Sequence, residues 1–209
     1  MEKINKLKKL FNYYNLDGYI VPKNDEFFGE YIPENKDKLK FISNFSGSYG
    51  FALILKNKNY LFVDGRYTLQ AKIQSGKLFD IVTIPNRFPS DVLKKKRLKI
   101  GFDPKLHTQK TLKIFFNKTS CKLVSINQNL IDKLWIKKEN SNLKKFYILP
   151  KQAVGQNYRL KINKLVNVLN EKKIDCQFIS ASENIAWLLN IRGQDSEFTP
   201  MPNAYLTLD

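Results

Sequence analysis

The chain has 209 residues, of which 43% are apolar and 13% aromatic, so it can bury a core and is not a wholly disordered protein. No apolar run approaches the ~18 residues of a membrane-spanning helix, and residues 1–10 lack a signal peptide's apolar stretch, so we expect a cytoplasmic protein without a membrane partner. Cys121 and Cys176 lie far apart without a companion histidine, which predicts two buried thiols rather than a disulfide framework or a zinc site.

The net charge of +17 has two interpretations. Residues 94–99 are the best candidate for contact with nucleic acid or an anionic surface. Specific nucleic-acid sites favour arginine, however, because its planar fork binds phosphate and guanine at two points. Most basic residues here are lysines, which is typical of a solvated surface, and nucleic acid is therefore the less favoured partner. The few arginines are Arg66, Arg87, Arg97, Arg159 and Arg192.

The first elements are a helix and a strand. Ile4, Leu7 and Phe11 recur at helical spacing and predict a helix over residues 2–14. Residues 16–22 predict a turn and a short buried strand that Pro22 closes. Residues 39–45 are read as a helix end or a short extended piece, and residues 46–50 as a turn.

A hairpin and further alternating elements follow. Two apolar strands flank the turn at residues 56–59, and a turn at 64–66 leads into a helix through residue 73. The interleaving predicts an α/β fold in which helices flank a mixed sheet. The later expected elements are strands at 79–84, 98–102 and 122–125, and helices at 109–117 and 129–142.

An internal repeat indicates a duplicated architecture. Residues 3–7 recur letter for letter as residues 161–165, and at the same offset the apolar segment 16–21 is echoed by 174–179. Residues 41–47 have a further counterpart at 187–193. The second copy reaches only the strand expected at 204–208, which predicts a truncated second domain and a longer ancestral protein.

Five segments in this order resemble the long form of Xaa-Pro aminopeptidase over nearly the whole chain, namely Ser46–Gly50, Phe62–Ala71, Ile100–Pro104, Asn129–Trp135 and Asn184–Asp195. That resemblance implies two related creatinase-type N-terminal domains followed by a metal-binding catalytic domain. The expected organisation is a first domain at residues 1–136, a linker at 137–152 and the first half of a second domain at 153–209.

The resemblance also implies the chemistry. Enzymes of this family remove the N-terminal residue that precedes proline in a peptide, using two divalent metal ions such as manganese. The metal ligands belong to the catalytic domain, so no residue here is assigned to metal binding or catalysis, and no cofactor is expected in this chain. We expect an inactive segment that positions the peptide substrate and supports assembly with the catalytic domain and in a homodimer.

One residue carries a functional role by resemblance. In long-form enzymes the arginine of the Asp-Gly-Arg-Tyr turn faces the catalytic domain and helps to bind the peptide, and here that residue is Arg66. The alternative is that Arg66 only pairs with Asp64 or caps a helix. For Arg192 and Trp187, a role at the domain junction and packing in the core are favoured over substrate contact.

Other candidates favour a structural interpretation. The expectation for His107 is a capping or surface role, and Ser46–Gly47–Ser48 lacks the flanking pattern and histidine of a nucleophile turn. A group of carboxylates is interpreted as a solvated loop rather than a metal site: Asp25, Glu26, Glu30, Glu34 and Asp37. The alternative function for the whole chain is a stand-alone basic binding module for nucleic acid or an anionic surface.

Overall fold

The computed structural model describes residues 1–94, 96–136, 145–195 and 198–209. The chain divides into two compact units, one of Met1–Glu26 and Glu34–Lys138 and the other of Phe27–Pro33 and Glu139–Asp209. None of the helices formed by the described residues combines the length and the apolar character needed to cross a bilayer.

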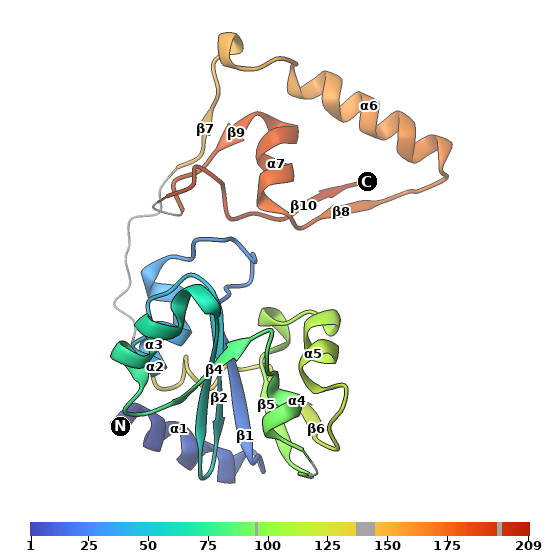
Figure 1. Ribbon diagram of the computed structural model, residues 1–209. Helices are drawn as coiled ribbons and strands as arrows, with labels where there is room; N and C mark the ends of the chain where they lie inside the picture. The colour runs from blue at the N-terminus through green and yellow to red at the C-terminus, as the bar shows by residue number, and fades with distance from the viewer. Residues whose placement is uncertain (95, 137–144, 196–197) are drawn as a thin grey trace. The chain divides into compact units, whose positions relative to one another are not determined.

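The first unit contains a six-stranded mixed sheet in the order β4-β3-β2-β1-β5-β6 (Figure 1). The pairs β1–β2 and β2–β3 are antiparallel, and the pairs β3–β4, β1–β5 and β5–β6 are parallel. The predicted hairpin and the mixed sheet are therefore confirmed. The strands are β1 Gly18–Pro22, β2 Gly50–Leu55, β3 Asn59–Asp64, β4 Asp80–Ile84, β5 Lys99–Phe102 and β6 Lys122–Ser125.

Helices cover both faces of this sheet because successive strand residues point to opposite sides. Tyr19 and Val21 join a core cluster with α1, α2 and α3, whereas Ile20 joins a second cluster with α5. The segment at 39–45, expected as a helix end or a short extended piece, contains most of α2 and its C-cap residue Asn44. The helices are α1 Glu2–Tyr13, α2 Lys38–Ser43, α3 Thr68–Ser75, α4 Pro89–Val92 and α5 Gln109–Phe116, with short 3-10 turns at Glu34–Lys36, Gly65–Tyr67 and Pro104–Leu106.

The described residues of the second unit form two helices and two small antiparallel sheets. Strand β8 pairs with β10, and β7 pairs with β9, so part of the stretch expected as a linker forms a strand. The elements are β7 Tyr147–Ile148, a 3-10 turn at Lys151–Ala153, α6 Tyr158–Glu171, β8 Gln177–Ile179, α7 Ser182–Leu189, β9 Ile191–Arg192 and β10 Leu206–Leu208.

The two units share the helix–turn–strand motif that the repeat predicts. After α1, Asn15 adopts a left-handed conformation with φ 51°, and after α6, Lys173 does the same with φ 55°. The next backbone N–H closes the helix end in both cases, from Leu16 to the carbonyl of Phe11 at 2.8 Å and from Ile174 to that of Leu169 at 2.9 Å. Equivalent turns at the same offset support duplication of one structural unit.

The equivalence extends through the next helix and strand. Helices α2 and α7 both end at a left-handed asparagine, Asn44 at φ 65° and Asn190 at φ 56°. Strand β10 runs antiparallel to β8, as β2 runs antiparallel to β1. The second unit is therefore a fragment of the same fold as the first.

The prediction of a helix at 129–142 is wrong for its described part, because residues 129–136 form only a turn. The Asn129 amide bonds outside a helical pattern, accepting from the backbone N–H of Ile131 at 2.9 Å and donating to Asp103 Oδ2 at 2.8 Å. Leu130 and Ile131 are fully buried against the first core cluster. Residues 137–142 lie outside the described residues.

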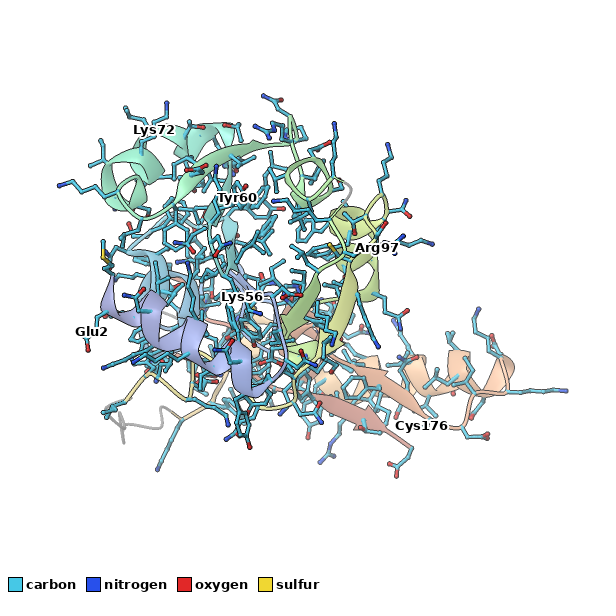
Figure 2. All side chains as sticks on the ribbon, turned by 90° about the horizontal axis from the view of Figure 1, so that it is seen from below. Glu2, Lys56, Tyr60, Lys72, Arg97 and Cys176 are labelled. Carbon is cyan, nitrogen blue, oxygen red and sulfur yellow. The ribbon has the colours of Figure 1, made fainter. Side chains whose placement is uncertain are left out.

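The prediction of two buried thiols is also wrong. Cys121 is half-buried, with its Sγ 3.5 Å from the carbonyl of Lys96. Cys176, labelled in Figure 2, is exposed in the turn before β8. By the offset of the repeat, Cys176 corresponds to Gly18, which is buried between its partners Leu55 in β2 and Ile100 in β5. Among the described residues, β8 has only β10 as a partner.

Candidate functional site

The Arg66 turn, residues Asp64–Tyr67, follows the end of β3. The Asp64 carboxylate accepts the backbone N–H of Arg66 at 2.9 Å, which starts the 3-10 turn that leads into α3. The same carboxylate accepts from Arg66 Nε to both of its oxygens at 3.2 Å and from Arg66 Nη2 at 2.6 Å. The pairing considered as the alternative role of Arg66 is therefore present.

The Arg66 side chain nevertheless faces solvent. It is 75% exposed, whereas the Asp64 side chain is mostly buried. The hydrogen bond from the guanidinium lowers the pKa of Asp64, so this carboxylate stays ionised at neutral pH. The aromatic ring of Tyr67 lies 5.3 Å from the guanidinium carbon. The turn thus holds a planar group of hydrogen-bond donors at the surface.

A second segment of the resemblance, Ser46–Gly50, lies against this turn. The hydroxyls of Ser48 and Tyr67 share a hydrogen bond at 2.7 Å. A side chain at Gly47 would meet the Phe45 ring at 2.3 Å, so glycine leaves room for that ring to pack edge-on against Tyr67, with centroids 5.8 Å apart. Two motifs separate in sequence therefore form one surface.

Sequence reasoning missed the polar side chains that complete this surface. Ser46 Oγ accepts from Gln70 Nε2 at 3.0 Å and from Gln74 Nε2 at 2.9 Å, and its backbone N–H donates to Gln74 Oε1 at 3.0 Å. The sequence predicts only a turn at Ser46–Gly47–Ser48. The signal available was their place in a segment that carries the family resemblance, together with Gln70 in a second such segment.

His107 is the C-cap residue of the 3-10 turn Pro104–Leu106, and its side chain is buried, so of the expected capping or surface role the surface role is wrong. The side chain is 7% exposed and packs edge-on to Phe102, with centroids 6.0 Å apart. Neither ring nitrogen has a hydrogen-bond partner among the described residues. Burial lowers the pKa of His107 to about 4, so the imidazole is neutral at pH 7. In the part of the chain that the structure describes, no nucleophile or carboxylate bonds to either ring nitrogen of His107.

The acidic loop is only partly solvated. Asp25 and Asp37 are buried, which differs from the expectation. Asp37 pairs with Lys23, and Glu26 Oε1 lies 2.6 Å from Lys36 Nζ. Lysines therefore pair with Asp37 and Glu26 in this loop.

No metal centre can be built from the described part of the chain. Within residues 1–94, 96–136, 145–195 and 198–209, no three His, Cys, Asp or Glu side chains come together in a group able to hold an ion. The two divalent ions implied by the resemblance therefore do not fit these residues, and we assign no metal-dependent step to them.

Trp187 does not pack in the core as expected. Its side chain is 61% exposed, while α7 buries Ile185, Ala186 and Leu188. At 3.6 residues per turn, Trp187 lies roughly 200° around the helix from Ile185, on the opposite face. Arg192 Nη1 donates to the carbonyls of Ala186 at 3.3 Å and Ile191 at 2.8 Å, contacts that lie within the second unit.

Comparison with known proteins matches two parts of the chain to the same domain family. Creatinase/prolidase N-terminal domain patterns match residues 3–134 and residues 137–209. "Probable Xaa-Pro aminopeptidase P" of Laccaria bicolor is 33% identical over 100% of this chain and 34% of its own length, and the Neosartorya fischeri protein of the same description is 32% identical over 98% and 33%. The chain thus spans about a third of the length of these curated relatives.

Comparison with solved structures finds the same fold in related enzymes. The X-prolyl aminopeptidase of Caenorhabditis elegans, described as a cytosolic enzyme with a di-nuclear active site, superposes with a TM-score of 0.87 at 29% identity, covering 99% of this chain and 37% of that one. Xaa-Pro dipeptidase of Bacillus anthracis shares the fold, with a TM-score of 0.52 at 20% identity over 82% of this chain and 43% of that chain. The chain belongs to the creatinase/prolidase N-terminal domain family and is homologous to the non-catalytic N-terminal region of Xaa-Pro aminopeptidases.

Proposed function

We propose that this chain is the non-catalytic N-terminal segment of a metal-dependent Xaa-Pro aminopeptidase. In that role it positions a peptide with proline at its second residue, in the cytoplasm, for a catalytic domain that holds two divalent metal ions. The observation that carries the proposal is the match of 99% of this chain to 37% of the Caenorhabditis elegans enzyme with a TM-score of 0.87. We also propose that the segment supports assembly with the catalytic domain and in a homodimer.

Within this segment, Arg66 is the proposed contact to the peptide. Its guanidinium is exposed while Asp64 holds one side of it. Arginine presents fixed planar donors, and lysine replaces them with a single mobile ammonium group. Arg66→Lys therefore separates a requirement for the fork geometry from a requirement for positive charge.

The experiment joins residues 1–209 to the metal-binding region of the Caenorhabditis elegans relative and measures release of the N-terminal residue from an Xaa-Pro peptide. Residues 1–209 alone should show no turnover with added manganese, because their described part forms no metal site. In the fusion, Arg66→Lys should lower kcat/KM by about tenfold, the loss expected for one charge-assisted hydrogen bond.

A matched control is Arg97→Lys. Arg97, labelled in Figure 2, is exposed and precedes β5. The start of β5 lies at the same end of the sheet as the start of β1 and the end of β2, because Gly18 pairs with both Ile100 and Leu55. Strand β3 runs antiparallel to β2 and therefore begins at this end, whereas the Arg66 turn follows the opposite end of β3. Wild-type kinetics in Arg97→Lys and reduced kcat/KM in Arg66→Lys support the proposal. Equal kinetics in both variants, or turnover by the purified chain alone, contradicts it.

A further inference from the structure

We infer that Asp64 is a positioning residue that holds the Arg66 guanidinium in its peptide-binding orientation, with Tyr67 supporting it. The inference rests on the proposed function, because it concerns how the proposed peptide contact is prepared. Pairing with Asp64 and contact with a peptide are then two parts of one arrangement rather than competing roles for Arg66.

The Asp64 carboxylate binds both the backbone and the side chain of Arg66. One oxygen, Oδ1, accepts the backbone N–H of Arg66 at 2.9 Å and fixes the turn. The second oxygen, Oδ2, accepts from Nη2 at 2.6 Å, and both oxygens lie 3.2 Å from Nε. Two points of attachment fix the plane of a guanidinium as well as its position. The Asp64 side chain is 23% exposed and that of Arg66 is 75% exposed, so the carboxylate is the less exposed partner of the pair.

Tyr67 supports the guanidinium from another direction. Its ring lies 5.3 Å from the guanidinium carbon, within the range of a cation–π contact. The ring is itself held, because its hydroxyl bonds to Ser48 at 2.7 Å and Phe45 packs edge-on against it. The support for Arg66 therefore extends to Ser48 in the turn before β2 and to Phe45, which belongs to the core of the first unit.

This arrangement explains why an exposed arginine can serve as a precise contact. A free arginine side chain samples many rotamers and loses that freedom when a ligand binds. A guanidinium already held by a carboxylate loses less on binding, so the peptide binds more tightly for the same final contacts. Loss of Asp64 should therefore weaken binding without slowing the chemical step.

The first test uses residues 1–209 alone and observes Arg66 directly. Nitrogen-15 relaxation should give Arg66 Nε a higher order parameter than Nε of the exposed Arg97. Asp64→Asn keeps one oxygen for the backbone N–H of Arg66 and removes the second oxygen together with the charge. In this variant the Arg66 order parameter should fall below its wild-type value and toward that of Arg97, because the contact with Tyr67 remains. Equal order parameters for Arg66 and Arg97 in the wild-type chain overturn the inference.

The second test measures kinetics in the fusion described above. Asp64→Asn should raise KM by about threefold to tenfold with kcat nearly unchanged, as expected when binding energy common to ground and transition states is lost. The matched control is Asp80→Asn, because Asp80 also pairs with a cation, Lys58 at 2.6 Å, but at the other end of β3. Asp80→Asn should leave KM unchanged.

The outcomes separate the two proposals. If Arg66→Lys has wild-type kinetics, the proposed function of Arg66 fails. If Arg66→Lys raises KM but Asp64→Asn does not, Arg66 keeps its role and the positioning inference fails alone. A fall in kcat without a change in KM shows that Asp64→Asn only reduces the folded fraction, and this also overturns the inference.

Discussion

Lys161 Nζ donates a hydrogen bond to the backbone carbonyl of Trp187 at 2.5 Å and lies 4.2 Å from the centroid of its ring. The first unit contains the same relationship, because Lys3 Nζ donates to the carbonyl of Phe41 at 3.0 Å and lies 4.2 Å from that ring. In the first unit, Phe41 also stacks on Trp135, with centroids 4.7 Å apart. Each pair links the first helix of its repeat to the second.

This contact leads to a prediction for Lys161→Met. Lys161 is buried and also donates to Asn190 Oδ1 at 2.6 Å. Methionine has a similar length but no donor, so the buried Asn190 oxygen loses that bond. The free energy of unfolding of the second unit should fall by about 1–3 kcal/mol. Hydrogen exchange of the α6 amides measures this loss, and the exposed Lys164→Met is the control. Equal protection in both variants contradicts the prediction.

A second prediction concerns acid sensitivity. Burial lowers the pKa of His107 to about 4 from an ordinary value of 6.5. The unfolded chain therefore binds a proton between pH 6.5 and pH 4 that the folded chain does not. Stability from this group is fully present above pH 6.5 and is lost as the pH falls towards 4, by about 3 kcal/mol in total. Urea unfolding at pH 7 and at pH 4.5 measures the loss.

His107→Leu should remove most of this pH dependence. Leucine places an apolar side chain in the same buried position and has no proton to bind. Carboxylates with a lowered pKa, such as Asp17 and Asp64, lose their stabilising effect below that range, as the pH falls through their folded pKa values. A variant that loses as much stability as wild type between pH 7 and pH 4.5 shows that other groups are responsible.

A third prediction uses the left-handed end of α2. Asn44 has φ 65°, a conformation that glycine adopts freely and that alanine adopts at a cost. Asn44→Ala should lower the free energy of unfolding by about 1 kcal/mol, whereas Asn44→Gly should stay within about 0.5 kcal/mol of wild type. Thermal unfolding of the two variants side by side measures the difference. Equal losses would show that the asparagine side chain, not the backbone, matters at this position.

A fourth prediction concerns proteolysis. The second unit exposes several large apolar side chains, among them Phe178, Trp187 and Phe198, while the first unit has two continuous core clusters. Local opening is easier where fewer apolar contacts hold the backbone. Limited proteolysis should therefore trim the chain back toward residues 140–152 and leave a resistant N-terminal fragment. First cleavages within β1 to β6, with residues 183–209 protected, would contradict this expectation.

The sequence was most informative where one local pattern decides the structure. The spacing of Ile4, Leu7 and Phe11 defines α1, and the two apolar runs around a polar turn define the β2–β3 hairpin. The repeat identified the second unit as a copy because its helix end, turn and strand depend on residues close together in the chain. The turn that presents Arg66 follows from the same kind of local pattern.

The sequence was least informative where distant segments decide which side chain is covered. Leu130 and Ile131 look like part of an apolar helix, but Asn129 bonds to Asp103 and holds them in a turn. The apolar neighbours of Trp187 predict burial, but Trp187 lies about 200° around α7 from the buried Ile185 and is exposed. The bond between Ser48 and Tyr67 depends on the packing of two separate segments, so neither motif alone predicts it.

The strand order of the first unit also determines when that unit can be completed during synthesis. Strands β2 and β3 are adjacent in the chain, so their hairpin needs only a short loop to close. Gly18 in β1 pairs with Ile100 in β5, and β5 pairs in turn with β6, which ends at Ser125. Because parallel pairs of this kind close long loops, residues 1–98 of the nascent chain leave one edge of β1 without its partner until β5 emerges from the ribosome.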